Sequence, residues 1–328
     1  MLELVHLEHL PEPGAGEVRV RIEAAGIGYT DTIVRRGRYM LYKGGLPVTP
    51  GYDMVGVIDK LGADVTGMQI GDRVADMSVY GAYSQFIVRP ARDLIPVPAG
   101  VDPVAAVEVP LMWMTAWQML TRSASLQPGA PILVVGASGA VGRALVLLGR
   151  HLGLRVIGTC SAVNLALVEA LGATAIDYHR ADLAAAIRAA SGGNGVAAAF
   201  DAVGGKSWQT SWDVLAPGGK LVGYGMQDFL ESGAPSSEAG KALVQFHQTW
   251  NAEGAADGSQ RSTTFYDINV RRDSHHHEYR ADAEHLLKLL ADGQVIPPDA
   301  EILSLDQAAE AHRRVALGGL QQRLVIRL

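Results

Sequence analysis

Three glycines lie three residues apart near the middle of the chain, at Gly136, Gly139 and Gly142. A pyrophosphate is bound by backbone N–H groups at the start of a helix, and glycine lacks the Cβ that would block its approach. The third glycine of such a set also lets the helix pack closely against the preceding strand. The simpler interpretation of the triplet alone is a glycine-rich turn. As a nucleotide site, it would hold a diphosphate over the amides of Ser138, Gly139, Ala140 and Val141.

The elements expected around the triplet favour the nucleotide site. Residues 132–135 form a short apolar run rich in β-branched side chains, which predicts a buried strand. An apolar helical pattern follows over residues 142–152, and residues 155–159 predict a second buried strand. The whole unit is about thirty residues long, the size of a βαβ crossover.

The end of the second strand indicates which dinucleotide would bind. NAD enzymes usually carry Asp or Glu there, to hold the ribose 2′-hydroxyl. Residues 158–161 are Gly-Thr-Cys-Ser and include no carboxylate. An anion would repel a 2′-phosphate, whereas the Ser161 hydroxyl can donate a hydrogen bond to it. The sequence therefore favours NADP over NAD.

Composition narrows the class of protein. The 328 residues include 28 basic and 34 acidic side chains, for a net charge of −6, and a single cysteine. We expect no nucleic-acid partner because there is no basic stripe, and no membrane association because no apolar run approaches a membrane span. One cysteine cannot build a disulfide framework or a cysteine-rich zinc site. The first residues do not resemble a signal peptide, so we expect a cytoplasmic protein.

The pattern along the chain predicts an α/β fold with two domains. Residues 1–107 predict a β-rich domain, with strands at 17–23, 55–58, 73–75 and 85–88. A helix at 109–120 leads into alternating elements, the arrangement of a doubly wound parallel sheet. Its strands are expected at 132–135, 155–159, 174–177, 196–201 and 220–224, and its helices at 142–152, 162–171, 181–190 and 207–215.

The remaining segments complete this arrangement. Residues 226–261 predict a loop with one helix at 240–250, and residues 263–270 predict an edge strand. A helix at 278–292 and a last strand at 323–327 should rejoin the first domain. The domain boundaries predicted in this way are 1–107 with 271–328, and 108–270.

Several motifs in order carry a resemblance to a known family. They are Ala-Gly-Ile-Gly-Tyr-Thr-Asp at 25–31, Pro-Gly-Tyr-Asp-Met-Val-Gly at 50–56, Gly-Asp-Arg-Val at 71–74, Gly-Ala-Tyr-Ser-Gln at 81–85, Thr-Ala at 115–116, the glycine triplet, and Phe-Asp-Ala-Val-Gly-Gly at 200–205. The chain resembles zinc-independent members of the medium-chain dehydrogenase/reductase superfamily, close to the quinone oxidoreductases (zeta-crystallin-like). The resemblance implies a Rossmann domain joined to a GroES-like catalytic domain. Relatives begin with one more strand before Leu2, so the start is expected to be shortened.

At two positions this chain differs from the zinc-dependent members, and both differences indicate that it binds no zinc. Those enzymes carry a cysteine two residues before the Thr-Asp pair and a Gly-His-Glu sequence in the second motif, where this chain has Gly28 and Tyr52. We therefore expect no metal and no ordinary alcohol oxidation. Quinone reductases usually carry Asn at the position of Gly28 and a basic residue near Leu165, and this chain has neither.

The resemblance also implies cofactor contacts outside the glycine turn. Tyr178 matches a tyrosine that NADP-binding relatives place beside the 2′-phosphate, and Thr115 matches a residue near the nicotinamide, although simple packing would also explain Thr115. Tyr224 and Gly225 are assigned to the same cofactor site.

Hydride transfer to a conjugated acceptor needs no metal, because the negative charge spreads onto the acceptor's own oxygen. A positioned O–H group can protonate that enolate, and Tyr29 and Tyr52 are the candidates. Packing in the wall of the cleft is the alternative role for both rings. We expect Asp31 to form a turn or a cap, and the three histidines at 275–277 to lie in a solvated loop.

The sequence thus predicts an NADPH-dependent, zinc-free reductase of quinones or α,β-unsaturated carbonyl compounds, which binds nicotinamide and substrate in a cleft between its domains. An enoyl-thioester reductase or a biosynthetic tailoring reductase is one alternative. A non-catalytic NADP-binding protein, crystallin-like or lipid-handling, is another, and Gly28 in place of Asn favours it. We expect a homodimer that pairs through strand 263–270, and substrate specificity in the loops at 38–47 and 226–262.

Overall fold

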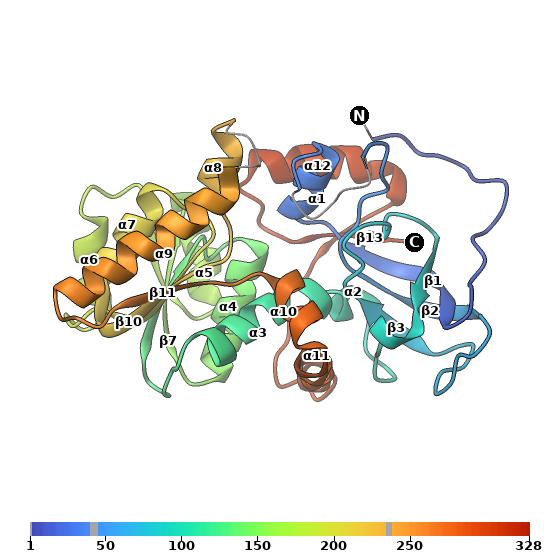
Figure 1. Ribbon diagram of the computed structural model, residues 1–328, viewed down its shortest axis with the longest axis horizontal. Coiled ribbons are helices and arrows are strands. Elements are labelled where there is room, and N and C mark those ends of the chain that lie inside the picture. Colours follow the sequence, from blue (N-terminus) through green and yellow to red (C-terminus); the bar gives the residue numbers. More distant parts are fainter. Residues whose placement is uncertain (1, 40–44, 234–237) are drawn as a thin grey trace. The chain divides into compact units, whose positions relative to one another are not determined.

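The computed structural model describes residues 2–39, 45–233 and 238–328 (Figure 1). The predicted specificity loops therefore lie partly outside the described residues, at 40–44 and 234–237. The chain divides into two compact units. Unit 1 is Met1–Met114 with His276–Leu328, and unit 2 is Thr115–His275.

Unit 2 is built on a six-stranded parallel sheet. Its strands run in the order β11-β10-β9-β6-β7-β8, so the chain winds outward in both directions from β6. The bounds are β6 Pro131–Val135, β7 Arg155–Cys160, β8 Thr174–Asp177, β9 Val196–Asp201, β10 Leu215–Gly223 and β11 Ser262–Phe265. The predicted doubly wound sheet is confirmed. Its two halves meet between β6 and β9, where such sheets bind ligands at the carboxyl ends of the strands.

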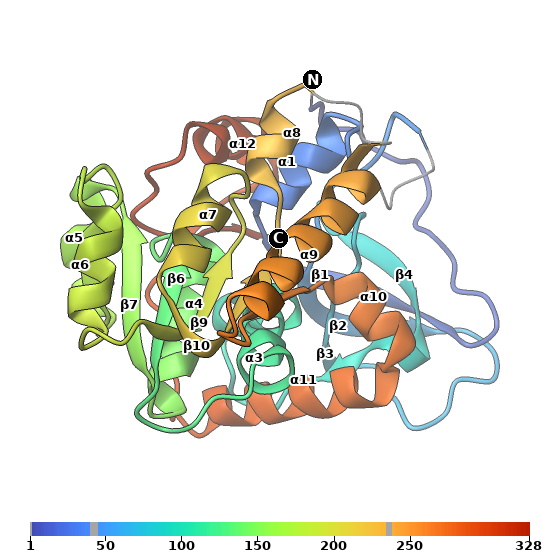
Figure 2. The ribbon, with the colours of Figure 1, turned by 60° about the vertical axis from the view of Figure 1, so that its left-hand side comes forward.

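Helices cover this sheet because its central strands are apolar on both faces. The helices that pack on its strands are α4 Ala140–His151, α5 Leu165–Ala170, α6 Leu183–Ala190, α7 Lys206–Asp213 and α9 Ala239–Ala256. The same part of the chain also contains α3 Met114–Gln118, α8 Gln227–Glu231 and α10 Ile268–Ser274. α5 and α6 pack against β8 and lie at the β7 side of the sheet in Figure 2. The core contains Leu133, Ile157 and Leu221 from the strands and Trp208 and Trp212 from α7.

Unit 1 contains a seven-stranded, mostly antiparallel sheet in the order β12-β13-β1-β2-β3-β5, with β4 paired to β1. The bounds are β1 Glu17–Gly26, β2 Met54–Leu61, β3 Arg73–Asp76, β4 Phe86–Pro90, β5 Ile95–Pro96, β12 Glu301–Leu303 and β13 Leu324–Arg327. Its helices are α1 Tyr29–Arg35, α2 Pro103–Ala106, α11 His276–Ala291 and α12 Ala308–Leu317. α1 packs against α12. The predicted β-rich domain is confirmed.

Two local predictions are wrong, and the predicted helix at 109–120 is present but has wider turns at its ends. The edge strand expected at 263–270 ends at Phe265, because the Asp267 carboxylate accepts hydrogen bonds from the N–H groups of Asn269 and Val270 and starts α10. Of the histidines at 275–277, which are exposed as predicted, His276 and His277 lie in α11 and not in a loop. The helix expected at 109–120 is α3 flanked by wider π-helical turns, Val109–Trp113 and Met119–Ser123.

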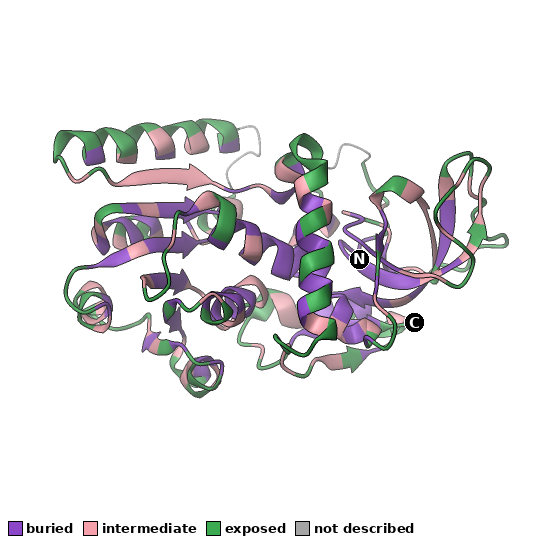
Figure 3. Ribbon diagram, turned by 90° about the horizontal axis from the view of Figure 1, so that it is seen from below, coloured by how far each residue is buried: buried purple, intermediate pink, exposed green. Residues whose placement is uncertain are grey.

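Burial follows the two sheets (Figure 3). The central strands of each unit are buried, whereas α9 has only Ala239, Phe246 and Gly254 buried along its length. No helix in the described ranges is both long and apolar enough to cross a membrane.

Candidate functional site

The glycine turn connects the end of β6 to the start of α4. Gly136 has a φ of +69°, a conformation that favours glycine, and the Ala137 N–H donates to the carbonyl of Thr159 at 2.8 Å. A Cβ on Gly142 would lie 2.2 Å from the Gly136 carbonyl oxygen, so only glycine allows this close approach. Gly139 caps the helix, and Ala140 and Val141 are its first residues. The turn therefore presents the backbone amides at the start of α4, the groups that bind a diphosphate.

Two residues that the sequence did not reveal hold this turn. The buried Asn164 amide donates to the Ser138 hydroxyl at 3.2 Å and to the Ser161 hydroxyl at 3.3 Å, and so joins the turn to the end of β7. Arg143, in the first turn of α4, donates from Nε to the Ser138 carbonyl at 2.6 Å. Its guanidinium adds positive charge beside the amides that would face a diphosphate.

Tyr178 follows β8 at the same end of the sheet at which Ser161 follows β7. Its N–H donates to the Cys160 carbonyl at 3.1 Å, and its ring packs on His179 with centroids 4.2 Å apart. The side chain is 47% exposed, so it is accessible to a ligand. The residue before it, Asp177, pairs with Cys160 across the two strands and brings a carboxylate to this end of the sheet.

The turn after β9 and the turn after β10 are held together. The Tyr224 N–H donates to the Asp201 carbonyl at 3.2 Å, and a Cβ on Gly225 would lie 2.7 Å from the carbonyl of Ala202. The buried Asp201 carboxylate accepts from the Val203 N–H at 2.8 Å, and from the hydroxyls of Ser207 and Ser211. Burial raises the pKa of the Tyr224 phenol, which is therefore a neutral donor. Thr115 is a buried residue of α3.

In unit 1, one carboxylate links the loops that carry both candidate tyrosines. The Asp31 carboxylate accepts from the Gly28 N–H at 2.8 Å and from the Gly51 N–H at 3.1 Å. These glycines directly precede Tyr29 and Tyr52. Asp31 therefore caps α1, as predicted, and also fixes the second loop. Burial raises the pKa of Asp31 to about 7, against the lowering effect of these hydrogen bonds.

The two tyrosines differ in their surroundings. Tyr52 is buried, and its hydroxyl lies 2.5 Å from that of Tyr39, with the rings edge to face. Tyr29 begins α1 and is partly exposed. The sequence analysis missed Tyr39, because its contact with Tyr52 joins two loops and leaves no local pattern.

A buried ion cluster anchors the residue after Tyr52. Asp53 lies 3.1 Å from Arg323, which also lies 2.8 Å from Glu108, and the Gly26 N–H donates to Asp53 at 3.0 Å. Removing one member of such a cluster leaves an uncompensated buried charge, so the cluster fixes the position of the loop.

Metal ligands were not expected here. Within the part of the chain that the structure describes, no three His, Cys, Asp or Glu side chains form a group able to hold a metal ion. Zinc-free chemistry stays a prediction.

Two family models match the chain. Residues 14–99 match the alcohol dehydrogenase GroES-like domain, and residues 140–259 match the zinc-binding dehydrogenase domain. A crystallised quinone oxidoreductase of Pseudomonas syringae is 28% identical, with a TM-score of 0.84 over 98% of this chain and 94% of that chain. The chain is a quinone oxidoreductase-like member of the medium-chain dehydrogenase/reductase superfamily.

Two further proteins are also similar to this chain. A 2-haloacrylate reductase of Burkholderia is 36% identical over 219 residues, which are 65% of this chain and 66% of the relative, just under two thirds of its length. A mycobacterial protein crystallised in complex with NADPH is 26% identical, with a TM-score of 0.83 over 99% of this chain and 95% of that chain.

Proposed function

We propose that this superfamily member is an NADPH-dependent reductase of quinones or α,β-unsaturated carbonyl compounds. The observation that carries the proposal is the Gly136–Gly142 turn, which brings backbone amides to the carboxyl end of β6, at the point where the strand order reverses. The names of the similar proteins support the same class, since they include a quinone oxidoreductase, a 2-haloacrylate reductase and a protein complexed with NADPH.

The residues of unit 2 fit a dinucleotide. The amides of Ser138, Gly139, Ala140 and Val141 would bind the diphosphate, with Arg143 adding positive charge. Ser161 and Tyr178 would bind the 2′-phosphate, and Thr115, Tyr224 and Gly225 would border the nicotinamide end. When bound, the cofactor supplies a hydride for the electron-poor carbon of the acceptor.

The residues of unit 1 supply the proton. Tyr29, partly exposed at the start of α1, donates its phenolic proton to the acceptor's enolate. The Tyr52 hydroxyl is paired with that of Tyr39. In this role, Tyr52 orients the donor hydroxyl of Tyr29 and excludes water from it. Asp31 holds both loops in register through Gly28 and Gly51.

Two measurements test the proposal. Calorimetry should show that NADPH binds more tightly than NADH, and stopped-flow absorbance should show loss of NADPH with a simple quinone or enone. Tighter binding of NADH would overturn the cofactor assignment and would point to Asp177. Binding of NADPH without turnover across quinones, enones and enoyl thioesters would favour the non-catalytic alternative, whereas turnover of thioesters alone would favour the enoyl-thioester reductase.

A homodimer that pairs through the outer edge of β11 is also proposed. The Tyr266 N–H donates to the Gly223 carbonyl of β10. Because the direction of the backbone groups alternates along a strand, the N–H and C=O groups of Thr263 and Phe265 point away from β10. The Thr263 N–H is bonded to the Asn251 side chain at 2.8 Å, which shields part of this edge. A partner strand must therefore displace Asn251 or pair beyond it.

A further inference from the structure

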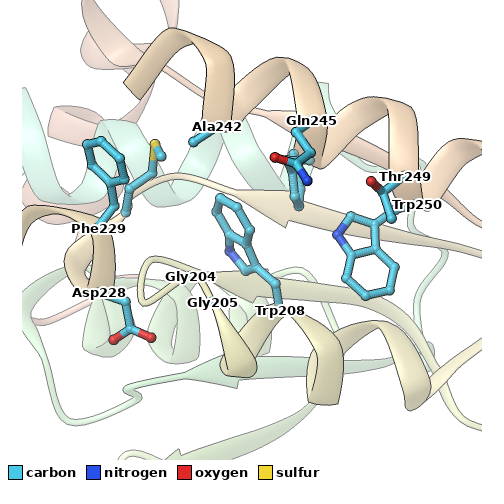
Figure 4. A pocket seen from close by; sticks show the side chains of 11 residues that line it. Gly204, Gly205, Trp208, Asp228, Phe229, Ala242, Gln245, Thr249 and Trp250 are labelled. Atoms are coloured by element: carbon cyan, nitrogen blue, oxygen red, sulfur yellow. The ribbon is translucent and has the colours of Figure 1, made fainter. Parts of the chain in front are cut away.

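A cavity lies in unit 2 beside the carboxyl ends of β9 and β10. Its volume is about 440 Å³, within the usual range for small-molecule sites. Gly204 and Met226 belong to the turns that follow these two strands, and Trp208 of α7 and Phe246 of α9 form its walls. Figure 4 shows Trp208 pointing into the space between Phe229 at one end and Trp250 at the other.

The walls are apolar because their polar atoms are used elsewhere. The Trp208 indole N–H donates to the Asp201 carbonyl at 3.4 Å, which leaves its hydrocarbon edge for the cavity. Trp208 and Phe246 pack on each other with centroids 4.1 Å apart and planes inclined at 44°. The two rings therefore form one continuous apolar surface. The surface suits a flexible chain.

The shape also indicates a chain. Lining residues recur along α9 from Ala242 through Gln245 to Trp250, a span of about 12 Å at the helical rise of 1.5 Å per residue. The polar lining residues on α9, Gln245 and Thr249, are exposed and lie at the rim. Asp228 is exposed at the Gly205 end, where a Cβ on that glycine would lie 2.6 Å from its carboxylate. An acidic rim disfavours a carboxylate-bearing chain.

We propose that this cavity binds the uncharged hydrocarbon tail of the acceptor. The substrate class of the proposed reductase is then a quinone or enone that carries an unbranched alkyl or acyl tail. This assignment rests on the proposed function only for the reactive head group, because the cavity is formed within unit 2 and would bind a chain whether or not reduction follows.

The cavity can be tested through chain length. With a series of straight-chain 1-alken-3-ones, we expect KM to fall roughly fourfold per added methylene until the cavity is filled, with kcat unchanged. Ala242→Phe, which places a ring in the cavity, should abolish this dependence and leave the shortest acceptor unaffected. Val244→Phe on the exposed face of the same helix is the matched control and should retain the wild-type slope. Phe229→Ala should move the optimum to longer chains.

A binding measurement separates the cavity from the reductase activity. Binding of the saturated alcohol 1-decanol should change the tryptophan emission, because Trp208 and Trp250 line the cavity. The affinity for decanol should be the same in the wild type and the Val244→Phe variant and at least tenfold weaker in Ala242→Phe, and decanoate should bind more weakly than decanol. Binding of decanol without any NADPH turnover would support the cavity and refute the proposed function. Turnover with a KM that does not depend on chain length, together with no binding of decanol, would refute the proposed role of the cavity. The proposed function would then still stand.

Discussion

At the level of single residues, Tyr29 and Tyr52 have different capacities to donate a proton. Tyr29 is partly exposed, whereas Tyr52 is 2% exposed and already shares a short hydrogen bond with Tyr39. We expect Tyr29→Phe to lower kcat by roughly 10²-fold, because general acid catalysis contributes that much or more. Tyr52→Phe should lower it less. NADPH affinity, measured by calorimetry, should not change in either variant; a larger loss for Tyr52→Phe would reverse the two assignments.

A second prediction at the level of single residues concerns the hydrogen bonds of Asp31. The Asp31 carboxylate accepts one hydrogen bond from the Gly28 N–H and one from the Gly51 N–H. In Asp31→Asn, one of these two N–H groups must face the amide NH₂, which cannot accept its hydrogen bond. Leaving a buried donor unsatisfied costs about 1–3 kcal/mol. We therefore expect urea unfolding at pH 4, where the folded carboxyl is protonated and its contribution to stability is present, to show a loss of this size. We also expect a lower kcat at neutral pH. Asp59→Asn, at a partly buried carboxylate of β2 that pairs with Arg19 and lies outside both tyrosine loops, should leave kcat unchanged.

The pH dependence of the same pair follows from linkage. Burial raises the pKa of Asp31 to about 7 from its unfolded value of 3.8, so the folded state binds more protons between these values. The contribution of Asp31 to stability is thus fully present below pH 3.8 and is lost as the pH rises toward 7. The difference in unfolding free energy between wild type and Asp31→Asn should therefore change across this window. A constant difference from pH 4 to pH 8 would contradict the raised pKa.

At the level of elements, the join between β6 and α4 depends on Gly142. In Gly142→Ala, the new methyl group would lie 2.2 Å from the Gly136 carbonyl, so the helix must move away from the strand. We expect a loss of about 1–3 kcal/mol in unfolding free energy and a weaker affinity for NADPH. Gly240→Ala, in α9 with nothing within 4 Å of its Cβ, is the control. It should be neutral or stabilising by up to about 1 kcal/mol, with unchanged NADPH affinity.

Elements with strong local patterns could be predicted from the sequence. The central strands β6 and β9 of unit 2 are largely apolar runs, and β8 and β9 have the predicted bounds. The segment 263–270 also alternates, but Asp267 caps the next helix, and this local hydrogen bonding prevails over the alternation. The short helix α1 was missed, because its seven residues are held by Asp31 and by packing on α12.

The candidate site could be predicted only in part, for a related reason. Gly136, Gly139 and Gly142 form a motif within seven residues, so the turn was visible in the sequence. Asn164 joins Ser138 to Ser161 from 26 residues away, and Tyr39 meets Tyr52 from another loop. Such contacts depend on how the chain folds back, and single residues of these types occur throughout the sequence.

At the level of the whole molecule, acid stability should depend on His312. This side chain is fully buried beside Tyr83, and burial together with the charge of Arg35 lowers its pKa to about 4 from 6.5. The unfolded chain binds the proton first, so stability present above pH 6.5 is lost as the pH falls toward 4. The glutamine of His312→Gln stays neutral over this range. The free energy of unfolding of this variant, measured by urea titration, should therefore fall by about 3 kcal/mol less than that of the wild type. Equal losses in both proteins would show that His312 is not the group responsible.

Cofactor binding should raise the free energy of unfolding of the protein, and the protected amides should lie in unit 2. All residues assigned to the dinucleotide belong to this unit, so NADPH at 100 times its Kd should add about 2.7 kcal/mol to the free energy of unfolding. Amide hydrogen exchange should slow at residues 136–142, at the end of β7 and in the turn after β10, because these amides and their supports are ordered by the ligand. Adenosine 2′,5′-bisphosphate, which lacks the nicotinamide, should slow exchange near Ser161 but not near Tyr224. Protection that begins in unit 1, or is identical for both ligands, would contradict the assigned orientation of the cofactor.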